Sequence, residues 1–329
     1  MPDAETLDEH ADAPKLVSPT LKTDSEYEVP LLKLFALHRV ATPYDVMNVF
    51  PGHFRYHNAV MRHLNRLHNQ GYLKRQDYDD KSYVYHITNA GYERCRDSDI
   101  GIDLSRLPYR YEEPTGRQVN HELLITKTAI AICQYLQQQK PKVRLLDHGR
   151  FGLQSEAAFE HLVPDYWYMV SDGNGLMVRF LEVIAGVESV TRIRSMFEEY
   201  ERWGQREEVQ RWLTERYRQH GAMQPQAEYQ VHCILESRSW KHTDAWKERM
   251  TIMQTFHVHP KMQGRVWTTT KEALDTALAE GSNINHPIWH RAKDFLGETR
   301  SRWELQPAGQ RTRFIDQCMR RLDTYPLFA

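Results

Sequence analysis

The sequence has few cysteines, and they are not arranged to hold a metal ion or a disulfide framework. Cys95, Cys133, Cys233 and Cys318 are far apart, and no two of them form a Cys-x-x-Cys pair. Zinc fingers and disulfide scaffolds bring their cysteines together at short, repeated spacings. The four residues are therefore predicted to be reduced thiols in a cytoplasmic protein.

Long apolar runs and glycine-rich phosphate loops are also missing. No stretch of the chain approaches the roughly 20 apolar residues of a membrane-spanning helix, and the first residues are acidic and polar, unlike a secretory signal. Neither a Gly-x-x-x-x-Gly-Lys-[Ser/Thr] loop nor a Gly-x-Ser-x-Gly elbow is present. These absences predict a cytoplasmic protein without a membrane partner, and they disfavour an NTPase.

The chain as a whole has no excess of positive charge, but its charges are unevenly distributed. The net charge is −1 over 329 residues. Residues 1–26 carry seven acidic residues and two lysines, a net charge of −5, which leaves the remainder at about +4. This first segment is poor in large apolar side chains and is predicted to be a disordered, solvated acidic tail. An acidic arm that competes with DNA for a basic helix is the alternative.

Acidic residues are absent between Pro51 and Gln76, and the rest of the chain is organised around this stretch. Val60, Leu64 and Leu67 recur at the spacing of one buried helix face. Arginine and asparagine residues fall on the other side: Arg55, Asn58, Arg62, Asn65, Arg66 and Asn69. Their planar side chains fit base edges in the major groove, so this helix is predicted to read double-stranded DNA.

The neighbouring segments predict a winged helix-turn-helix. Two helices are expected, over residues 29–40 and 44–50, and two strands, over residues 72–77 and 82–88. Thr42 would be the N-cap of the second helix and Pro43 its first residue. The third helix would then enter the groove, and Lys74, Arg75 and Lys81 of the wing would contact phosphates. A three-helix core with a hairpin that binds no DNA is the alternative.

Beyond this segment the order of elements predicts a second domain. Helices are expected over residues 120–139, 190–203, 243–256 and 271–280, and strands over residues 142–146, 163–170, 176–184, 229–236 and 265–269. A helix, three strands, a helix and a strand form the core order of the restriction-endonuclease-like fold, so the predicted fold class is α+β with a mixed α/β second domain. The predicted units are an acidic tail (1–26), a winged helix (27–97), a linker (98–118), a degenerate nuclease-like domain (119–296) and a C-terminal helical extension (297–329).

Three acidic residues stand where a nuclease of this fold would hold a metal ion. Asp165 and Glu182 are expected on paired strands, and Glu122 on the preceding helix. Carboxylates so placed hold Mg²⁺ or Mn²⁺ in nucleases. The lysine that stabilises the transition state in such enzymes is expected two residues after the second acid, and that residue is Ile184. The sequence thus favours a nuclease-like fold without a cofactor, and metal-dependent nuclease activity is the alternative.

Four segments of the chain resemble one protein family: YVYHITNAGYERC (83–95), NHELLITKTAIAI (120–132), VPD (163–165) and FLEVIAGVESVTRIRSMFEEY (180–200). They are similar to segments of the replication-relaxation proteins of bacterial plasmids, phages and integrative elements. Glu182, Gly186, Ser189 and Tyr200 match the outline of the last segment, whereas Ile184 and Phe197 stand where the family more often has an acid and a lysine. The resemblance implies an N-terminal winged helix, a degenerate nuclease-like domain and DNA binding in the maintenance of mobile elements.

The function predicted from these observations is sequence-specific DNA binding, in a transcriptional regulator of a mobile element or bacterial operon. The second domain would serve homodimerisation or partner binding. A two-fold dimer would place two reading helices about 34 Å apart on DNA. Two alternatives remain open, namely a metal-dependent nuclease or nickase that uses Asp165 and Glu182, and a module that binds another protein.

Overall fold

A computed structural model of the chain describes residues 27–79, 82–96, 114–138, 143–150, 162–171, 175–185, 190–219, 228–236, 262, 264–279, 284–287, 289–291, 305–307, 310 and 327. The predicted acidic tail, the predicted helix over residues 243–256 and Lys81 lie outside these residues. Among the helices that the structure does describe, none is both long enough and apolar enough to cross a lipid bilayer.

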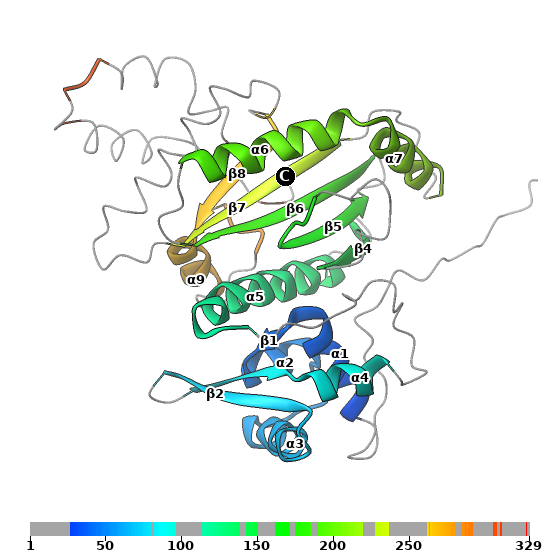
Figure 1. The fold of residues 1–329 in the computed structure, drawn as a ribbon, viewed down its shortest axis with the longest axis vertical. Helices are drawn as coiled ribbons and strands as arrows, with labels where there is room; N and C mark the ends of the chain where they lie inside the picture. Colours follow the sequence, from blue (N-terminus) through cyan, green and yellow to red (C-terminus); the bar gives the residue numbers. More distant parts are fainter. Residues whose placement is uncertain are drawn as a thin grey trace, which may run out of the picture.

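The N-terminal unit consists of helices packed on a small antiparallel sheet (Figure 1). Its elements are α1 (Glu28–His38), β1 (Val40–Ala41), α2 (Pro43–Val49), α3 (His57–Asn69), β2 (Leu73–Asp79), β3 (Ser82–Ile87) and α4 (Asn89–Arg96). The strand order is β1-β3-β2. Three helices followed by a hairpin are therefore observed in the predicted order.

Local features of the chain mark the end of α1 and the start of α2. Thr42 and Asp45 form a reciprocal capping box at the start of α2, with Pro43 in the first turn. The predicted first helix, by contrast, was too long, because Val40 pairs with His86 as a strand instead of extending α1. Arg39, with φ 63°, turns the backbone out of the helix between the two elements.

In the part of the chain that the structure describes, the larger unit is a six-stranded mixed sheet with helices on both faces. Its elements are α5 (Gly116–Gln138), β4 (Arg144–Gly149), β5 (Tyr166–Ser171), β6 (Leu176–Ala185), α6 (Val190–Gln205), α7 (Glu207–Gln219), β7 (Glu228–Glu236), β8 (Val266–Thr270), α9 (Lys271–Ala279) and β9 (His290–Arg291). Strands β4, β5 and β6 are antiparallel, β6, β7 and β8 are parallel, and β9 is antiparallel at the edge. The mixed α/β character agrees with the predicted α+β class.

The helices divide the larger unit into two apolar layers. Helices α6 and α7 cover one face of the sheet, and α5 covers the other face, on the side of the N-terminal unit (Figure 1). Strand residues alternate between these layers: Trp167 and Met169 face α6, whereas Tyr166 and Tyr168 face α5. Helix α5 begins at Gly116, four residues before its predicted start at residue 120.

Helix α5 belongs to both units at once. Ile130 lies in the core of the N-terminal unit, whereas Ile132 lies in the core of the larger unit. The Thr126 hydroxyl donates to the backbone oxygens of His38 (3.0 Å) and Val40 (2.8 Å), and all three groups are buried. The two units therefore share one central helix, which fixes their relative position.

Candidate functional site

Helix α3 is divided lengthwise into a buried face and a polar face. Val60, Leu64 and Leu67 are each 0% exposed and form part of the core of the N-terminal unit. Of the six residues predicted to face DNA, four are exposed and two are half-buried; the exposed ones are Arg55, Asn58, Arg62 and Asn69, and the half-buried ones are Asn65 and Arg66. Helix α3 therefore has a polar face, and Asn65 and Arg66 in its middle are less exposed than the other four residues.

The half-buried Asn65 is held in place by the adjoining hairpin. Its side-chain oxygen accepts hydrogen bonds from the Tyr85 hydroxyl (2.9 Å) and from Arg75 Nη1 (3.5 Å). The Arg75 guanidinium also lies over the Tyr83 ring, 4.7 Å from its centroid. Asn65 and Arg75 are thus positioned relative to each other, and Lys74 is exposed beside them on β2.

The start of α3 is uncapped by side chains. Tyr56 is the N-cap residue, and within the described part of the chain it provides no side-chain hydrogen bond to the first turn. The amide groups of a helix N-terminus attract phosphate when nothing else satisfies them. Tyr56 is 62% exposed and lies under the Arg55 guanidinium, 5.5 Å away. Sequence reasoning missed Tyr56, although an aromatic residue directly before a basic helix was a visible signal.

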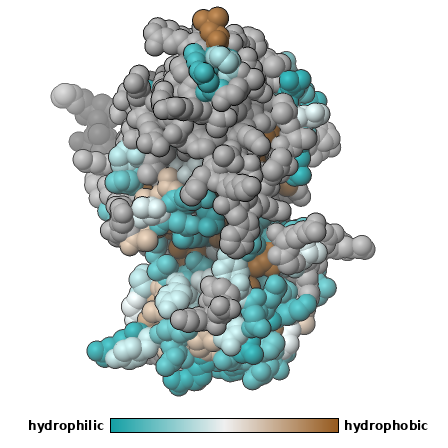
Figure 2. Space-filling view, turned by 90° about the vertical axis from the view of Figure 1, so that its left-hand side faces the viewer, coloured by the Kyte–Doolittle hydropathy of each residue, from teal (hydrophilic) through white to brown (hydrophobic). Residues whose placement is uncertain are grey.

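The surface around α3 is strongly hydrophilic. In the lower part of Figure 2, which is formed by the N-terminal unit, hydrophilic residues cover most of the visible surface. Among the described residues of this unit, Tyr44, Tyr56 and Tyr78 are the large hydrophobic side chains that are exposed by more than two fifths. An aromatic and basic surface of this kind suits a polar, negatively charged partner.

The structure brings Asp165 and Glu182 to one pocket, as their predicted strand pairing requires. The pocket has a volume of about 310 Å³ and is also lined by His121, Tyr200 and Glu199. Asp165 Oδ1 lies 3.1 Å from His121 Nε2, and its Oδ2 accepts a 2.8 Å hydrogen bond from the Val183 amide. Asp165 therefore ties α5 to β6.

The second acid of the pocket is bound by a tyrosine. The Tyr200 hydroxyl donates a short hydrogen bond to Glu182 Oε1. Burial and the adjacent Glu182 charge raise the pKa of Tyr200 well above its ordinary value, so the phenol keeps its proton and remains a donor. Burial alone would lower the pKa of His121, but the hydrogen bond and charge of Asp165 outweigh it, and the net shift is upward.

Glu122, the expected third ligand, does not join this pocket, so that expectation was wrong. It is buried and forms ion pairs with Arg150 and with Arg39 Nη1, the latter at 3.2 Å. Adjacent helix residues point about 100° apart. His121 consequently faces the pocket while Glu122 faces the junction with the N-terminal unit. Nothing in the local sequence distinguished these two directions.

The donor set of the pocket fits a metal ion poorly. Both oxygens of Asp165 already accept hydrogen bonds, and Glu182 is bound by Tyr200. Among the residues that the structure describes, no three His, Cys, Asp or Glu side chains are grouped as ligands of one ion. Ile184 lines the pocket at the position where a lysine was expected. The arrangement resembles a network of hydrogen bonds more than a cation site.

The chain matches a protein-family model over much of its length. A family model described as replication-relaxation matches residues 32–215, which is more than half of the chain and includes both α3 and the Asp165 pocket. No curated protein and no solved structure matches the chain.

Proposed function

We propose that this chain, which belongs to the replication-relaxation family, is a DNA-binding protein that reads duplex DNA with α3. The family points to a replication-related role in mobile elements such as plasmids and phages. In this proposal the N-terminal unit is a winged helix, α3 is its reading helix and the β2–β3 hairpin is its wing.

The observation that carries the proposal is the one-signed exposed face of α3. No acidic residue occurs in α3, whereas Arg55, Asn58, Arg62 and Asn69 are exposed around it. A solvated helix face usually mixes both signs of charge, because mixed pairs stabilise the helix. Arginine and asparagine instead offer paired donors and acceptors to guanine and adenine edges.

The flanking contacts support the same orientation. Arg75 is exposed on β2 and contacts Asn65 in the C-terminal half of α3, and Lys74, the preceding residue of β2, is also exposed. The uncapped first turn of α3 adds backbone amides at its other end. Phosphate contacts from both ends would position the helix, and the side chains between them would supply base contacts.

The larger unit supports a role in assembly more than in chemistry. Its order of a helix, three strands, helices and parallel strands is that of nuclease-like domains, which we propose to be retained here for dimerisation or for binding a protein partner. A two-fold dimer would bind an inverted repeat with half-sites about 34 Å apart. Control of transcription or of replication would follow from occupancy of that site.

A second candidate function is favoured by one observation. Asp165 and Glu182 line the same pocket, as the acids of a metal-dependent nuclease do. The hydrogen bonds of both acids and the diversion of Glu122 disfavour a metal ion there. DNA binding without cleavage is therefore the better-supported function.

The test of DNA binding is selection from a random duplex library at about physiological salt with EDTA present. We expect enrichment of an inverted repeat, and loss of binding to it in the variant Arg62→Ala/Arg66→Ala by roughly tenfold or more, since each bidentate base contact is worth about 1–3 kcal/mol. The matched control is Arg211→Ala/Arg218→Ala, which removes two exposed charges from α7. It should bind the selected duplex as the wild type does.

Each other outcome is informative. Binding without enrichment of any motif would leave only attraction to phosphates and remove the sequence-reading role. Equal loss in both double variants would mean that net charge, and not α3, determines affinity. No binding at all would overturn the proposal and favour a protein partner for the N-terminal unit.

A further inference from the structure

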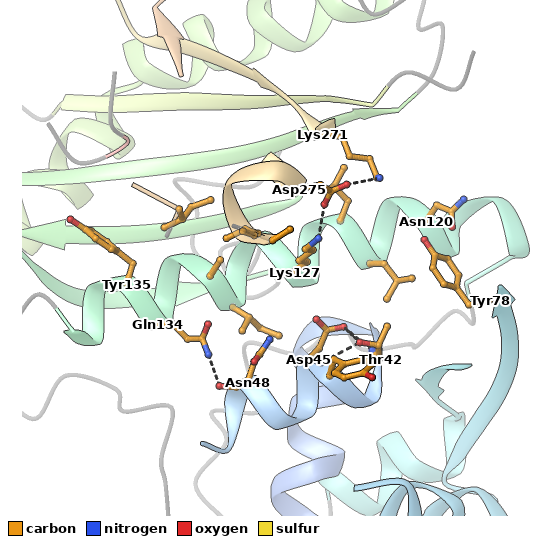
Figure 3. Close-up of a pocket in the computed structure, with 18 of the residues that line it drawn as sticks. Thr42, Asp45, Asn48, Tyr78, Asn120, Lys127, Gln134, Tyr135, Lys271 and Asp275 are labelled. Carbon is orange, nitrogen blue, oxygen red and sulfur yellow. Dashed lines mark hydrogen bonds and ion pairs between the residues drawn. The ribbon is translucent and has the colours of Figure 1, made fainter. Parts of the chain in front are cut away.

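A long groove lies where the N-terminal unit meets the larger unit. It has a volume of about 930 Å³, within the range of small-molecule sites. Helix α5 forms its floor, α2 one wall and α9 the other (Figure 3). The lining residues of α5 recur at intervals of three or four from Asn120 to Gln138, so the groove runs about 27 Å along the helix.

The exposed charge inside the groove is positive. The ammonium groups of Lys127 and Lys271 both bind the carboxylate of Asp275, at 2.5 and 2.8 Å (Figure 3). All three side chains are at least one third exposed. The proximity of Asp275 raises the pKa of Lys271 against the lowering effect of burial, so this lysine stays charged. One carboxylate thus faces two cations.

The second acid of the groove does not cancel this excess. Asp45 is 8% exposed, and its Oδ2 accepts hydrogen bonds from the Thr42 amide (2.8 Å) and hydroxyl (2.7 Å). Burial raises the pKa of Asp45. An anion that enters the groove would therefore meet the two exposed lysines, whereas the carboxylate of Asp45 is buried and already bound by Thr42.

The rest of the lining suits a planar polar ring. Side-chain amides are spaced along the groove on Asn48, Asn120 and Gln134, and each amide offers both a donor and an acceptor. The Tyr78 ring lines the end near Asn120 and is 43% exposed (Figure 3). Apolar side chains such as Leu123 and Ile130 lie between the polar groups. A heterocyclic base has polar edges and an apolar aromatic face, so it matches a lining of amides, a tyrosine ring and apolar side chains.

We propose that this groove is a binding site for a small organic anion with a planar ring, of the chemical class of nucleotides. The site is built from both units, since Thr42, Asn48 and Tyr78 come from the N-terminal one and Lys127 and Lys271 from the larger one. A ligand there would contact α2 and the hairpin that flanks α3, and it would change DNA affinity by linkage. This coupling rests on the proposed DNA-binding function, whereas binding of the ligand does not.

The experiment measures binding of four probes, AMP, GMP, CMP and UMP, to the full chain by calorimetry and by the shift in melting temperature. We expect at least one monophosphate to bind, and inorganic phosphate or the corresponding nucleoside alone to bind at least tenfold more weakly. Lys127→Gln and Lys271→Gln should each weaken binding by about tenfold, because each removes a charge-assisted contact.

Asp275→Asn provides a test of opposite sign. It removes the carboxylate that both lysines share, so it should tighten binding of the monophosphate, while a purely structural role for the cluster predicts weaker binding. Arg218→Gln, which removes an exposed charge from α7 outside the groove, is the control and should leave nucleotide affinity unchanged.

Three results would overturn the proposal: no binding of any monophosphate, equal binding of inorganic phosphate, or affinities that none of the groove variants changes. The DNA-binding proposal is judged separately, with the selected duplex and no nucleotide present. If DNA binds but the nucleotide does not, only the groove proposal fails. If the nucleotide binds but DNA does not, the groove proposal is supported and the proposed coupling to α3 is rejected.

Discussion

Two buried histidines determine how the stability of this protein responds to acid. His38 is 3% exposed at the end of α1, and burial, with nearby His148 and Arg150 adding to it, lowers its pKa from 6.5 to about 3. His232 is 0% exposed in the sheet, and burial lowers its pKa well below the ordinary value. Both side chains are therefore neutral in the folded protein at neutral pH.

The predicted effect is a loss of stability between pH 7 and pH 5. The unfolded chain protonates each histidine below about pH 6.5 while the folded protein does not, so the stabilising contribution is present above pH 6.5 and falls as the pH decreases. Each group should contribute up to about 1.4 kcal/mol per pH unit below that point. Urea unfolding of the wild type at several pH values measures this slope.

The variant His38→Gln isolates one of these groups. It removes one titrating residue, so its free energy of unfolding should depend less steeply on pH than that of the wild type. His121 acts in the opposite direction, because its pKa is raised in the folded state. A slope for His38→Gln equal to that of the wild type would show that His38 has the same pKa in the folded and unfolded states, which would contradict the prediction.

At the scale of secondary-structure elements, the acidic pocket connects the β5–β6 pair to helices α5 and α6. Asp165 links α5 to β6 through His121 and the Val183 amide, and Glu182 links β6 to α6 through Tyr200. Asp165 and His121 are 44 residues apart in the sequence, and the other two contacts each span 18 residues. We therefore infer that Asp165 and Glu182 have a structural role, which is to hold α5 and α6 against the sheet.

The corresponding prediction is that Asp165→Ala destabilises the protein by about 1–3 kcal/mol, because the buried Val183 amide and the half-buried His121 ring lose a hydrogen-bond partner. The loss should be the same in Mn²⁺ and in EDTA, as measured by urea unfolding. Glu199→Ala, an exposed residue of the same pocket, is the control and should have little effect. Stabilisation of the wild type by Mn²⁺ that is absent from Asp165→Ala would instead support the nuclease alternative.

At the scale of the whole molecule, α5 makes the two units one cooperative structure. Ile130 is 2% exposed in the core of the N-terminal unit, and Ile132 is 0% exposed in the core of the larger one. Val119 and Leu123 of the same helix pack against Val40 and Val84 of the small sheet. Neither unit can keep its core if α5 unfolds.

We therefore predict a single unfolding transition. The N-terminal unit, residues 27–96, contains no tryptophan, whereas the described part of the larger unit contains Trp167, Trp203, Trp212, Trp267 and Trp289. Tryptophan fluorescence therefore reports on the larger unit, and hydrogen exchange of α1 to α3 reports on the N-terminal unit. Ile130→Ala and Ile132→Ala should each cost about 2–5 kcal/mol and should lower both signals together. If Ile130→Ala lowered only the exchange protection of α1 to α3, the units would be independent.

Local chemistry allowed several features to be predicted from the sequence. The periodicity of Val60, Leu64 and Leu67 gave the buried face of α3, and Thr42 with Pro43 gave the start of α2. Periodicity and capping act over a few residues, so they are visible without a fold. The order from α5 to α6 in the larger unit, and the elements β7, β8 and α9, were predicted for the same reason, whereas the short edge strand β9 was not.

Other features depend on contacts that no local pattern encodes. Val40 became a strand because His86 was available to pair with it, and Glu122 turned to the junction because Arg39 and Arg150 lie there. The groove between α2, α5 and α9 involves residues more than two hundred positions apart. Such contacts are decided by the packing of whole elements.

The sequence by itself determined the family, the class of fold and the basic character of α3, because these follow from composition, periodicity and short motifs. Only the tertiary structure decided which polar groups meet. It placed Asp165 with His121, removed Glu122 from that pocket and set Lys127 against Lys271 and Asp275. The physical reason is that the direction of a side chain is fixed by its neighbours in space, and α5 acquires those neighbours only when both units fold around it.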